Sequence, residues 1–285
     1  MKESVKVAAV QMAVAWLDPQ ANLAKMERAL EQVASRGGAD LVVFPELANL
    51  GYIKGREAPD FATFSVEYAR KAERIPGPFT SALGDLAKRF DCHIVAGMAE
   101  AHPVVTATLY NSAVLINPEG KVVGVHRKAH IPGEEKHFFY AGNTPDVYPT
   151  DIGQVGIMIC ADGAYPELAR VLTLKGAEIL CVTYARTRDL SPDPDVTFRV
   201  ISCRAFENNN FVVACNRVGQ EEKNHFAGRS VICGPWGQFL ALSEDDNEDV
   251  LTATLRREEL EAARARYVRF RDRRPELYGQ ITEPL

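Results

Sequence analysis

Two short stretches, residues 38–44 (GADLVVF) and residues 176–182 (GAEILCV), decide the fold of this 285-residue chain. Each starts with a glycine that can end a helix in the left-handed conformation. An alanine and an acidic residue follow, and then an apolar run of strand length. Each stretch also follows an earlier apolar strand segment, at residues 5–12 and 155–159. Two β-α-β-like halves of this kind predict an α/β chain whose sheets are sandwiched between helices.

The remaining apolar runs and turn signals extend this pattern along the chain. Asp18 and Pro19 open a helix that glycines at 37–38 end, and Thr80 or Ser81 can cap the next helix. Proline at 166 starts another helix, and residues 196–207 form a further one. Strands are expected at the following ranges: 93–98, 109–116 and 121–126 as a hairpin, 211–214, 229–233 and 238–242. Residues 51–77 show no clear periodicity.

Bulk composition excludes several classes of protein. The chain is 46% apolar and carries a net charge of −5, so it has no basic footprint for nucleic acid. No segment approaches the ~20 consecutive apolar residues of a membrane span. The six cysteines form no C-x-x-C pair, which indicates reduced thiols in a cytoplasmic protein. With no low-complexity linker, residues 1–285 are predicted to be a single domain.

The C-terminal part, about residues 256–285, is predicted to be an arm. Residues 256–274 contain eight arginines against four acidic residues. A solvated, helix-rich segment is the favoured interpretation, because mixed-charge runs usually lie on exposed helices. The alternative is that the arm clasps a second subunit.

A candidate nucleophile, Cys160, ends the apolar strand at residues 155–159. A short polar turn follows it, and Pro166 then begins a helix. This pattern lifts a side chain out of a sheet and directs backbone N–H groups toward it, which favours a thiolate. On the pattern alone a buried structural cysteine is the better interpretation, because cysteine is among the residues most often buried.

Two other ionisable residues follow predicted strands. Glu46 comes after Phe44 and Pro45, and Lys128 ends the second strand of the hairpin. Taken singly, each is more readily a surface charge. The six histidines show no metal-ligand spacing and nothing pairs one of them with Cys160, so we expect no metal and no cofactor.

Three sequence motifs contain these residues and occur in a fixed order along the chain. They are Phe44-Pro45-Glu46, Arg127-Lys128-x-His130-Ile131-Pro132 and Ile159-Cys160-x-Asp162-x-x-Tyr165-Pro166-Glu167. Together they closely resemble the signature blocks of the nitrilase (carbon–nitrogen hydrolase) superfamily. Supporting similarity, as in Asn111-Ser112-Ala113 and Asn216-Arg217-Val218-Gly219, runs through nearly the whole chain.

The resemblance implies a fold, a set of roles and an assembly. The fold is an αββα four-layer sandwich, and the subunits pair into homodimers or higher homo-oligomers. Glu46 is implied as general base, Lys128 as electrophilic support and Cys160 as nucleophile. A second glutamate is implied at Glu135, with Glu134 as the alternative. The reaction needs no cofactor: a thioester forms on the cysteine and water then cleaves it.

The residues after Cys160 narrow the substrate by resemblance. Nitrile-cleaving members typically have Trp-Glu where this chain has Ala161-Asp162, and D-specific carbamoylases have two arginines where it has Gly163-Ala164. The segment is most similar to that of aliphatic amidases, although those chains are longer. The hairpin and the segment Asn216-Arg217-Val218-Gly219 are instead similar to those of N-carbamoyl amine hydrolases. A linear primary amide is therefore the predicted substrate, with an N-carbamoyl amine or amino acid as the alternative and a nitrile less favoured.

The remaining candidates are substrate-binding residues. The backbone N–H of Ala161 could help Lys128 hold an oxyanion. Tyr52, Tyr184 and Arg186 follow predicted strands and are candidates to line the pocket, with a structural role as an equal alternative for each. A non-enzymatic binding scaffold is the contrasting class. It is disfavoured, because such a scaffold has no need to keep four polar groups buried together.

Overall fold

The first sheet contains the N-terminal half of the chain and one late strand. The computed structural model describes residues 1–53 and 61–284. The strand order is β15-β1-β2-β3-β4-β5, with the short strand β6 paired to β4. The bounds are β1 Ser4–Gln11, β2 Leu41–Val43, β3 His93–Ala101, β4 Leu109–Ile116, β5 Val122–Arg127, β6 Phe139–Tyr140 and β15 Asp249–Arg256.

The second sheet is built from the other half. Its order is β14-β13-β10-β9-β8-β7, and a separate small ribbon pairs β11 with β12. The bounds are β7 Val147–Thr150, β8 Gly153–Ile159, β9 Ile179–Tyr184, β10 Phe211–Asn216, β11 Gln220–Glu221, β12 Asn224–His225, β13 Val231–Cys233 and β14 Phe239–Leu242.

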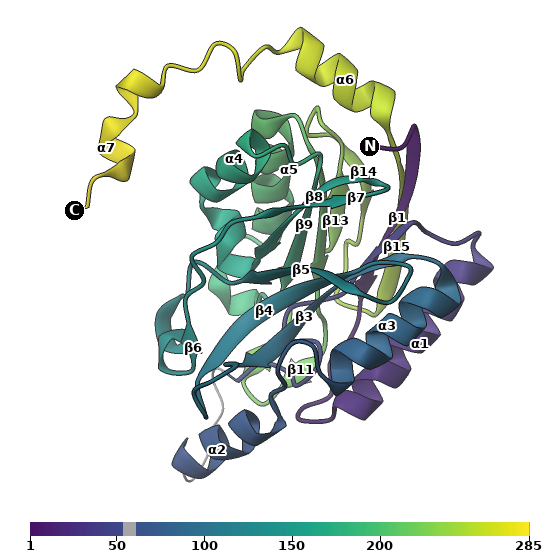
Figure 1. The fold of residues 1–285 in the computed structure, drawn as a ribbon, viewed down its shortest axis with the longest axis vertical. Coiled ribbons are helices and arrows are strands. Elements are labelled where there is room, and N and C mark those ends of the chain that lie inside the picture. Colours follow the sequence, from purple (N-terminus) through teal and green to yellow (C-terminus); the bar gives the residue numbers. More distant parts are fainter. Residues whose placement is uncertain (54–60, 285) are drawn as a thin grey trace.

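Strand alternation divides the core into three apolar layers. Val7 and Val43 face the second sheet and pack with residues such as Ile157, while Ala8 and Val42 face the opposite way. The helices α1 (Pro19–Ser35) and α3 (Pro78–Phe90) cover that outer face, and α4 (Pro166–Leu174) and α5 (Val196–Asn208) cover the second sheet. Figure 1 shows the resulting order of helices, two sheets and helices. The predicted αββα sandwich is confirmed.

The two similar stretches of sequence occupy equivalent places. Residues 38–44 contain β2, which is parallel to both β1 and β3. Residues 176–182 lead into β9, which is parallel to both β8 and β10. The two strands therefore present their carboxyl ends at the same kind of position in each sheet, where loops carry function in α/β folds.

Several local predictions were wrong or incomplete. The strand β15 was not predicted, although it pairs with the whole of β1 in antiparallel register. Within the unassigned range 51–77, residues 54–60 lie outside the described residues and Phe61–Lys71 forms the helix α2. The third helix begins at Pro78, so Thr80 is inside its first turn, where its hydroxyl oxygen accepts from the N–H of Gly77 at 2.8 Å.

The arm contains α6 (Arg257–Arg266), the 3-10 turn η4 (Pro275–Leu277) and α7 (Gly279–Thr282), and it extends outside the sandwich (Figure 1). Arg264 holds α6 to the body by donating to the carbonyl of Ala177 at 2.9 Å and to Asn210 Oδ1 at 2.6 Å. Among the described residues, no helix is both long and apolar enough to cross a membrane.

Candidate active site

A buried lysine lies between two buried glutamates. Lys128 directly follows β5, and its Nζ donates to Glu46 Oε1 and to Glu135 Oε2, both at 2.8 Å. All three side chains are fully buried. Two carboxylates against one ammonium leave a formal charge of −1. Burial, and then the nearby charge of Glu135, raises the pKa of Glu46, while Lys128 opposes the shift. For Lys128, burial lowers the pKa, but the carboxylate of Glu46 and its other neighbours outweigh this and raise it overall.

Further hydrogen bonds hold the two carboxylates in place. Asn111 Nδ2 donates to Glu46 Oε1 at 2.7 Å, and the N–H of Ala185, just after β9, donates to Glu46 Oε2 at 2.7 Å. The hydroxyl of Tyr52 donates to Glu135 Oε1 at 2.5 Å. The carboxylate at Lys128 therefore belongs to Glu135, whereas Glu134 is exposed.

Cys160 follows β8 in an unusual backbone conformation. Its φ is +48°, in the left-handed region that non-glycine residues rarely adopt, and it opens the 3-10 turn η2 (Cys160–Ala164). The residue as a whole is only partly buried, unlike the lysine and the glutamates. Burial and then the charge of Glu46 raise the pKa of the thiol, while Lys128 and the N–H of Ala185 lower it. The thiol is therefore protonated at rest and needs a base to become a nucleophile.

Asp162 joins the cysteine turn to the lysine loop. Its carboxylate accepts from the N–H of Ile159 at 3.1 Å and from the N–H of His130 at 2.9 Å. The rings of His126 and His130 lie 2.9 Å and 2.8 Å from its oxygens. Burial raises the pKa of Asp162, but the hydrogen bonds from His126 and then His130 outweigh this and lower it well below its usual range. The carboxylate thus remains charged in the interior.

A tyrosine packs against the turn that follows Cys160, so the turn has room only for a glycine at position 163. A Cβ built on Gly163 would meet Tyr184 Oη at 2.5 Å. From α5, Arg204 donates to the carbonyl of Gly163 at 3.0 Å and to that of Ala164 at 3.1 Å. Tyr184 is buried, and its hydroxyl fills the space beside Gly163.

The other predicted residues are distributed around this cluster. Ala161 is partly exposed in η2 beside Cys160, and Tyr52 is buried against Glu135. Arg186 follows Ala185 and lines a separate pocket of about 430 Å³. The described parts of the chain contain no group of three or more His, Cys, Asp or Glu side chains arranged to hold a metal ion.

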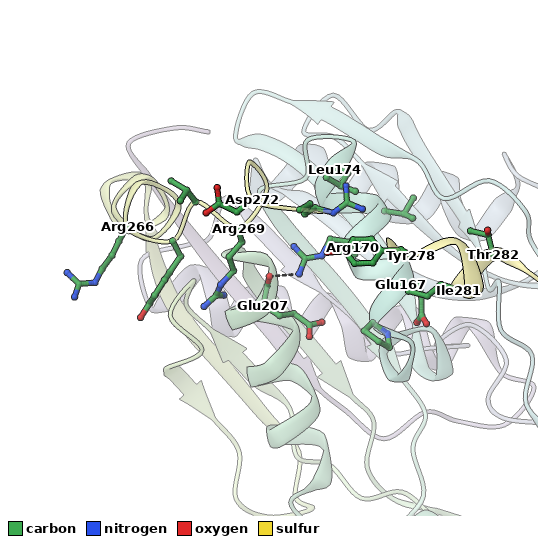
Figure 2. Close-up of a pocket in the computed structure, with 15 residues that line it drawn as sticks. Glu167, Arg170, Leu174, Glu207, Arg266, Arg269, Asp272, Tyr278, Ile281 and Thr282 are labelled. Carbon is green, nitrogen blue, oxygen red and sulfur yellow. Dashed lines mark hydrogen bonds between the residues drawn. The ribbon is translucent and has the colours of Figure 1, made fainter. Parts of the chain in front are cut away.

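A larger cavity, of about 950 Å³, lies elsewhere. The outer face of α4 and the arm line it, including Arg170, Leu174 and Tyr278. Figure 2 shows these side chains, with Arg170 hydrogen-bonded to the backbone of Glu207. Neither Cys160 nor the buried lysine cluster contributes to its lining.

Comparisons with known proteins agree with this geometry. Residues 6–265 match the family model described as carbon-nitrogen hydrolase. The chain therefore belongs to the carbon–nitrogen hydrolase family, within the nitrilase superfamily. It is 37% identical over 281 residues to a nitrilase from Pyrococcus abyssi, covering 96% of this chain and 99% of that one. It is 33% identical over 291 residues to an N-carbamoylputrescine amidase from Oryza sativa, covering 96% and 93%. The crystal structure of a carbon-nitrogen hydrolase from Helicobacter pylori superposes with a TM-score of 0.87 at 28% identity, covering 99% of both chains.

Sequence reasoning missed three supporting residues. Asp162 was considered only as part of a motif, and Asn111 only as part of the resemblance; neither was predicted to hold the site together. Ala185 carries no side-chain signal, since it acts through its backbone N–H. An aspartate three residues after a buried Ile159 and an asparagine inside an apolar strand are signals that could have been used for these two residues, because buried polar side chains require partners.

Replacing Asp162 by asparagine should loosen the site and destabilise the fold. Asp162→Asn keeps the shape but removes the buried charge, and breaking a buried ionic network costs about 3–5 kcal/mol. The folded pKa of Asp162 is depressed below 3.8, so its stabilisation is complete above that pH and is lost as pH falls through the folded value. Urea unfolding of wild type and variant should show the full difference at pH 7 and a shrinking one below pH 3.8.

The exposed Asp85→Asn in α3 provides a matched control, with the same change of charge and little effect on stability. A difference between wild type and Asp162→Asn that stays constant down to the lowest pH would contradict the ionic role.

Proposed function

We propose that this chain hydrolyses the C–N bond of a linear amide through a thioester on Cys160. The observation that carries the proposal is the position of Glu46. Its carboxylate accepts hydrogen bonds from Lys128, Asn111 and Ala185. Its negative charge raises the pKa of the Cys160 thiol, so the two groups are near each other. A base whose orientation is fixed in this way, with a raised pKa, suits proton transfer near neutral pH.

The reaction begins when Glu46 takes the proton of the Cys160 thiol. The sulfur attacks the amide carbon, and the carbonyl electron pair moves to oxygen. Lys128 Nζ and the N–H of Ala161 stabilise that oxyanion. The oxyanion then collapses, the C–N bond breaks, and Glu46 returns the proton to the departing nitrogen, which leaves as ammonia.

Water completes the cycle. Glu46, again unprotonated, takes a proton from a water molecule while the water oxygen attacks the thioester carbon. The second oxyanion collapses and the C–S bond breaks, while Glu46 returns the proton to sulfur. The product leaves as the carboxylic acid, which loses its proton to solvent to become a carboxylate. Glu135 keeps Lys128 charged throughout and orients the substrate, and Tyr52 holds Glu135. The cycle uses only protons and water, so no cofactor enters it.

A purely structural or binding role fits the site less well. Removing ionised side chains from water costs several kcal/mol per ion unless they are paired. A scaffold would gain nothing from a surplus carboxylate buried beside a strained, partly exposed cysteine.

Replacing the nucleophile tests this mechanism directly. Cys160→Ala should leave ammonia release from amides below about 10⁻³ of wild type, by analogy with the loss of other catalytic nucleophiles, with an unchanged circular dichroism spectrum. Iodoacetamide should inactivate the wild type, and mass spectrometry should map the label to Cys160 ahead of the other five cysteines. Cys203→Ala, at an exposed cysteine on α5, is the control and should keep activity. Substantial turnover by Cys160→Ala would show that another group attacks the amide.

A primary amide is our first choice of substrate, and an N-carbamoyl amine is the second. The first rests on the similarity of residues 160–167 to aliphatic amidases. The second gains support from the 33% identity to the N-carbamoylputrescine amidase of Oryza sativa. A nitrile remains the third candidate substrate, because the Pyrococcus abyssi relative is named a nitrilase. This chain, however, has Ala161-Asp162 where nitrile-cleaving members typically have Trp-Glu.

Competition on one carbon skeleton distinguishes the three substrates. We expect kcat/KM for the primary amide to exceed that for the N-carbamoyl amine and for the nitrile by at least about tenfold, or 1.4 kcal/mol of transition-state stabilisation. Ammonia release and product analysis by mass spectrometry measure all three. A higher kcat/KM for the carbamoyl compound would establish the second choice instead.

We also propose that the chain is a single cytoplasmic domain that forms homodimers or higher homo-oligomers through α4, α5 and the arm. All six cysteines are free, which suits a reducing compartment. Large apolar side chains are exposed on this face, namely Val171, Leu174, Phe206, Leu277 and Ile281. A second copy would cover them and the cavity shown in Figure 2.

A charge on the apolar face should prevent this assembly. Leu174→Glu places a carboxylate among apolar side chains, so the variant should be a monomer by light scattering at concentrations where the wild type is a dimer or larger. Val123→Glu on β5 adds the same charge to another exposed apolar position and should leave assembly unchanged. Wild-type protein that is itself monomeric, or a Leu174→Glu variant that assembles normally, would contradict the proposed interface.

A further inference from the structure

A second polar pocket lies beside the chain that follows β9. It has a volume of about 430 Å³, and three arginines line it, Arg186, Arg188 and Arg229, together with Ala227 and Asp246. Arg186 directly follows Ala185, whose N–H bonds Glu46, and the N–H of Ala227 donates to the carbonyl of Arg186 at 2.9 Å. One wall of the pocket is therefore the same strand end that holds the proposed base.

Arg186 is buried with unused hydrogen-bonding capacity. Its side chain is only 5% exposed, and its Nη1 donates to Thr197 Oγ1 at 3.1 Å. Its Nη2 is buried and has no hydrogen-bond partner among the described residues. Within the same residues, no carboxylate forms an ion pair with it. Burial lowers the pKa of this guanidinium, while the Tyr184 and Cys160 side chains raise it, which also indicates that it lies near the nucleophile. A buried guanidinium without an acidic partner is costly unless a ligand supplies one.

Arg229 extends the same donor surface. Its backbone is left-handed, with φ of +62°, and the preceding Gly228 is left-handed as well. A Cβ on Gly228 would meet the carbonyl oxygen of Asp245 at 2.6 Å, so this backbone path has little freedom. Arg229 Nε lies 3.4 Å from Asp195, but in the described structure its Nη1 is buried without a partner. A non-glycine residue held in this conformation suggests a functional constraint on its direction.

The third arginine is already neutralised. Arg188 is half-exposed and forms an ion pair with Asp246, which His225 Nε2 also approaches at 3.2 Å. Asp246 is the acidic residue in the pocket lining, so the lining carries more positive than negative charge. The free donors are those of Arg186 and Arg229, and a cationic substrate end would meet unfavourable charge here.

We propose that this pocket binds a carboxylate at the end of the substrate opposite the scissile C–N bond. The inference rests on the proposed amide hydrolysis and names its substrate class: a linear amide whose far end is anionic. Two guanidinium donors suit the two oxygens of a carboxylate, and charge-assisted hydrogen bonds are about twice as strong as neutral ones. A pocket of this volume is within the range of small-molecule sites, so it has room for a short carbon chain.

Paired substrates test this proposal. Monoamides of linear dicarboxylic acids, with four to six carbons, are compared with the neutral methyl esters of the same molecules. Wild-type kcat/KM should favour the acid by about 30-fold, the effect of one or two charge-assisted hydrogen bonds. Arg186→Gln and Arg229→Gln should each reduce this ratio to within about threefold of one, while Arg186→Lys should restore part of it.

Arg199→Gln is the matched control. Arg199 is an exposed arginine of α5, paired with Asp193 and absent from the pocket lining, so its loss removes the same charge without removing a proposed contact. The acid-to-ester ratio of this variant should equal that of the wild type. A ratio that falls equally in Arg199→Gln and Arg186→Gln would show a diffuse field rather than a binding site and would overturn the proposal.

Product inhibition of the wild type is a second measurement, and it does not depend on whether the arginine variants fold. A linear dicarboxylate of matching length should inhibit the wild type at least about tenfold more strongly than the monocarboxylate of equal length. If neutral and anionic amides are hydrolysed equally, the carboxylate site is wrong while amide hydrolysis stands. If neither is hydrolysed, but Cys160→Ala still binds the dicarboxylate selectively by calorimetry, the pocket stands and the proposed reaction is wrong.

Discussion

The buried contact of Lys128 with Glu46 and Glu135 is the constraint on which the rest of the site depends. Three charged side chains without solvent exposure are stable only as a set, because removing one partner of a buried pair costs about 3–5 kcal/mol. The set is also not neutral, since it has one carboxylate in excess. The hydrogen bonds from Asn111 and Ala185 to Glu46 offset part of that excess. The contacts within this cluster therefore fix the positions of the loops that carry its residues.

The sandwich brings the cluster together from both sheets. Glu46 follows β2 and Lys128 follows β5 in the first sheet, whereas Cys160 and Ala185 follow β8 and β9 in the second. The hydrogen bond from Ala185 to Glu46 crosses between the sheets, as does the bond from the N–H of Glu46 to the carbonyl of Tyr184 at 3.3 Å. The apolar layer between the sheets fixes their spacing, so the site has the rigidity of the core.

Residue order alone predicted a large part of this arrangement. An apolar run followed by a polar residue predicts a strand end, and this locates Glu46, Lys128 and Cys160 correctly at strand ends. Relations between distant segments were harder to predict. The strand β15 pairs with β1 across more than two hundred residues, and the local sequence of β15 does not indicate this distant partner. The packing of Tyr184 against Gly163 was not predicted, because it has no local signature in the sequence.

In the proposed reaction, the electrostatics of the site connect deprotonation of Cys160 to the arrival of substrate. At rest the excess negative charge and burial both disfavour a thiolate at Cys160, so the raised pKa of the thiol keeps it protonated. Negative charge that moves to a substrate oxygen beside Lys128 is instead paired with a buried cation, and such pairing is strong where water is excluded. The proton on Glu46 at that stage also removes the surplus carboxylate charge. In the mechanism that we propose, the cluster is thus better matched to the charge distribution of the tetrahedral intermediate than to that of the free thiolate, which is the condition for catalysis by differential binding.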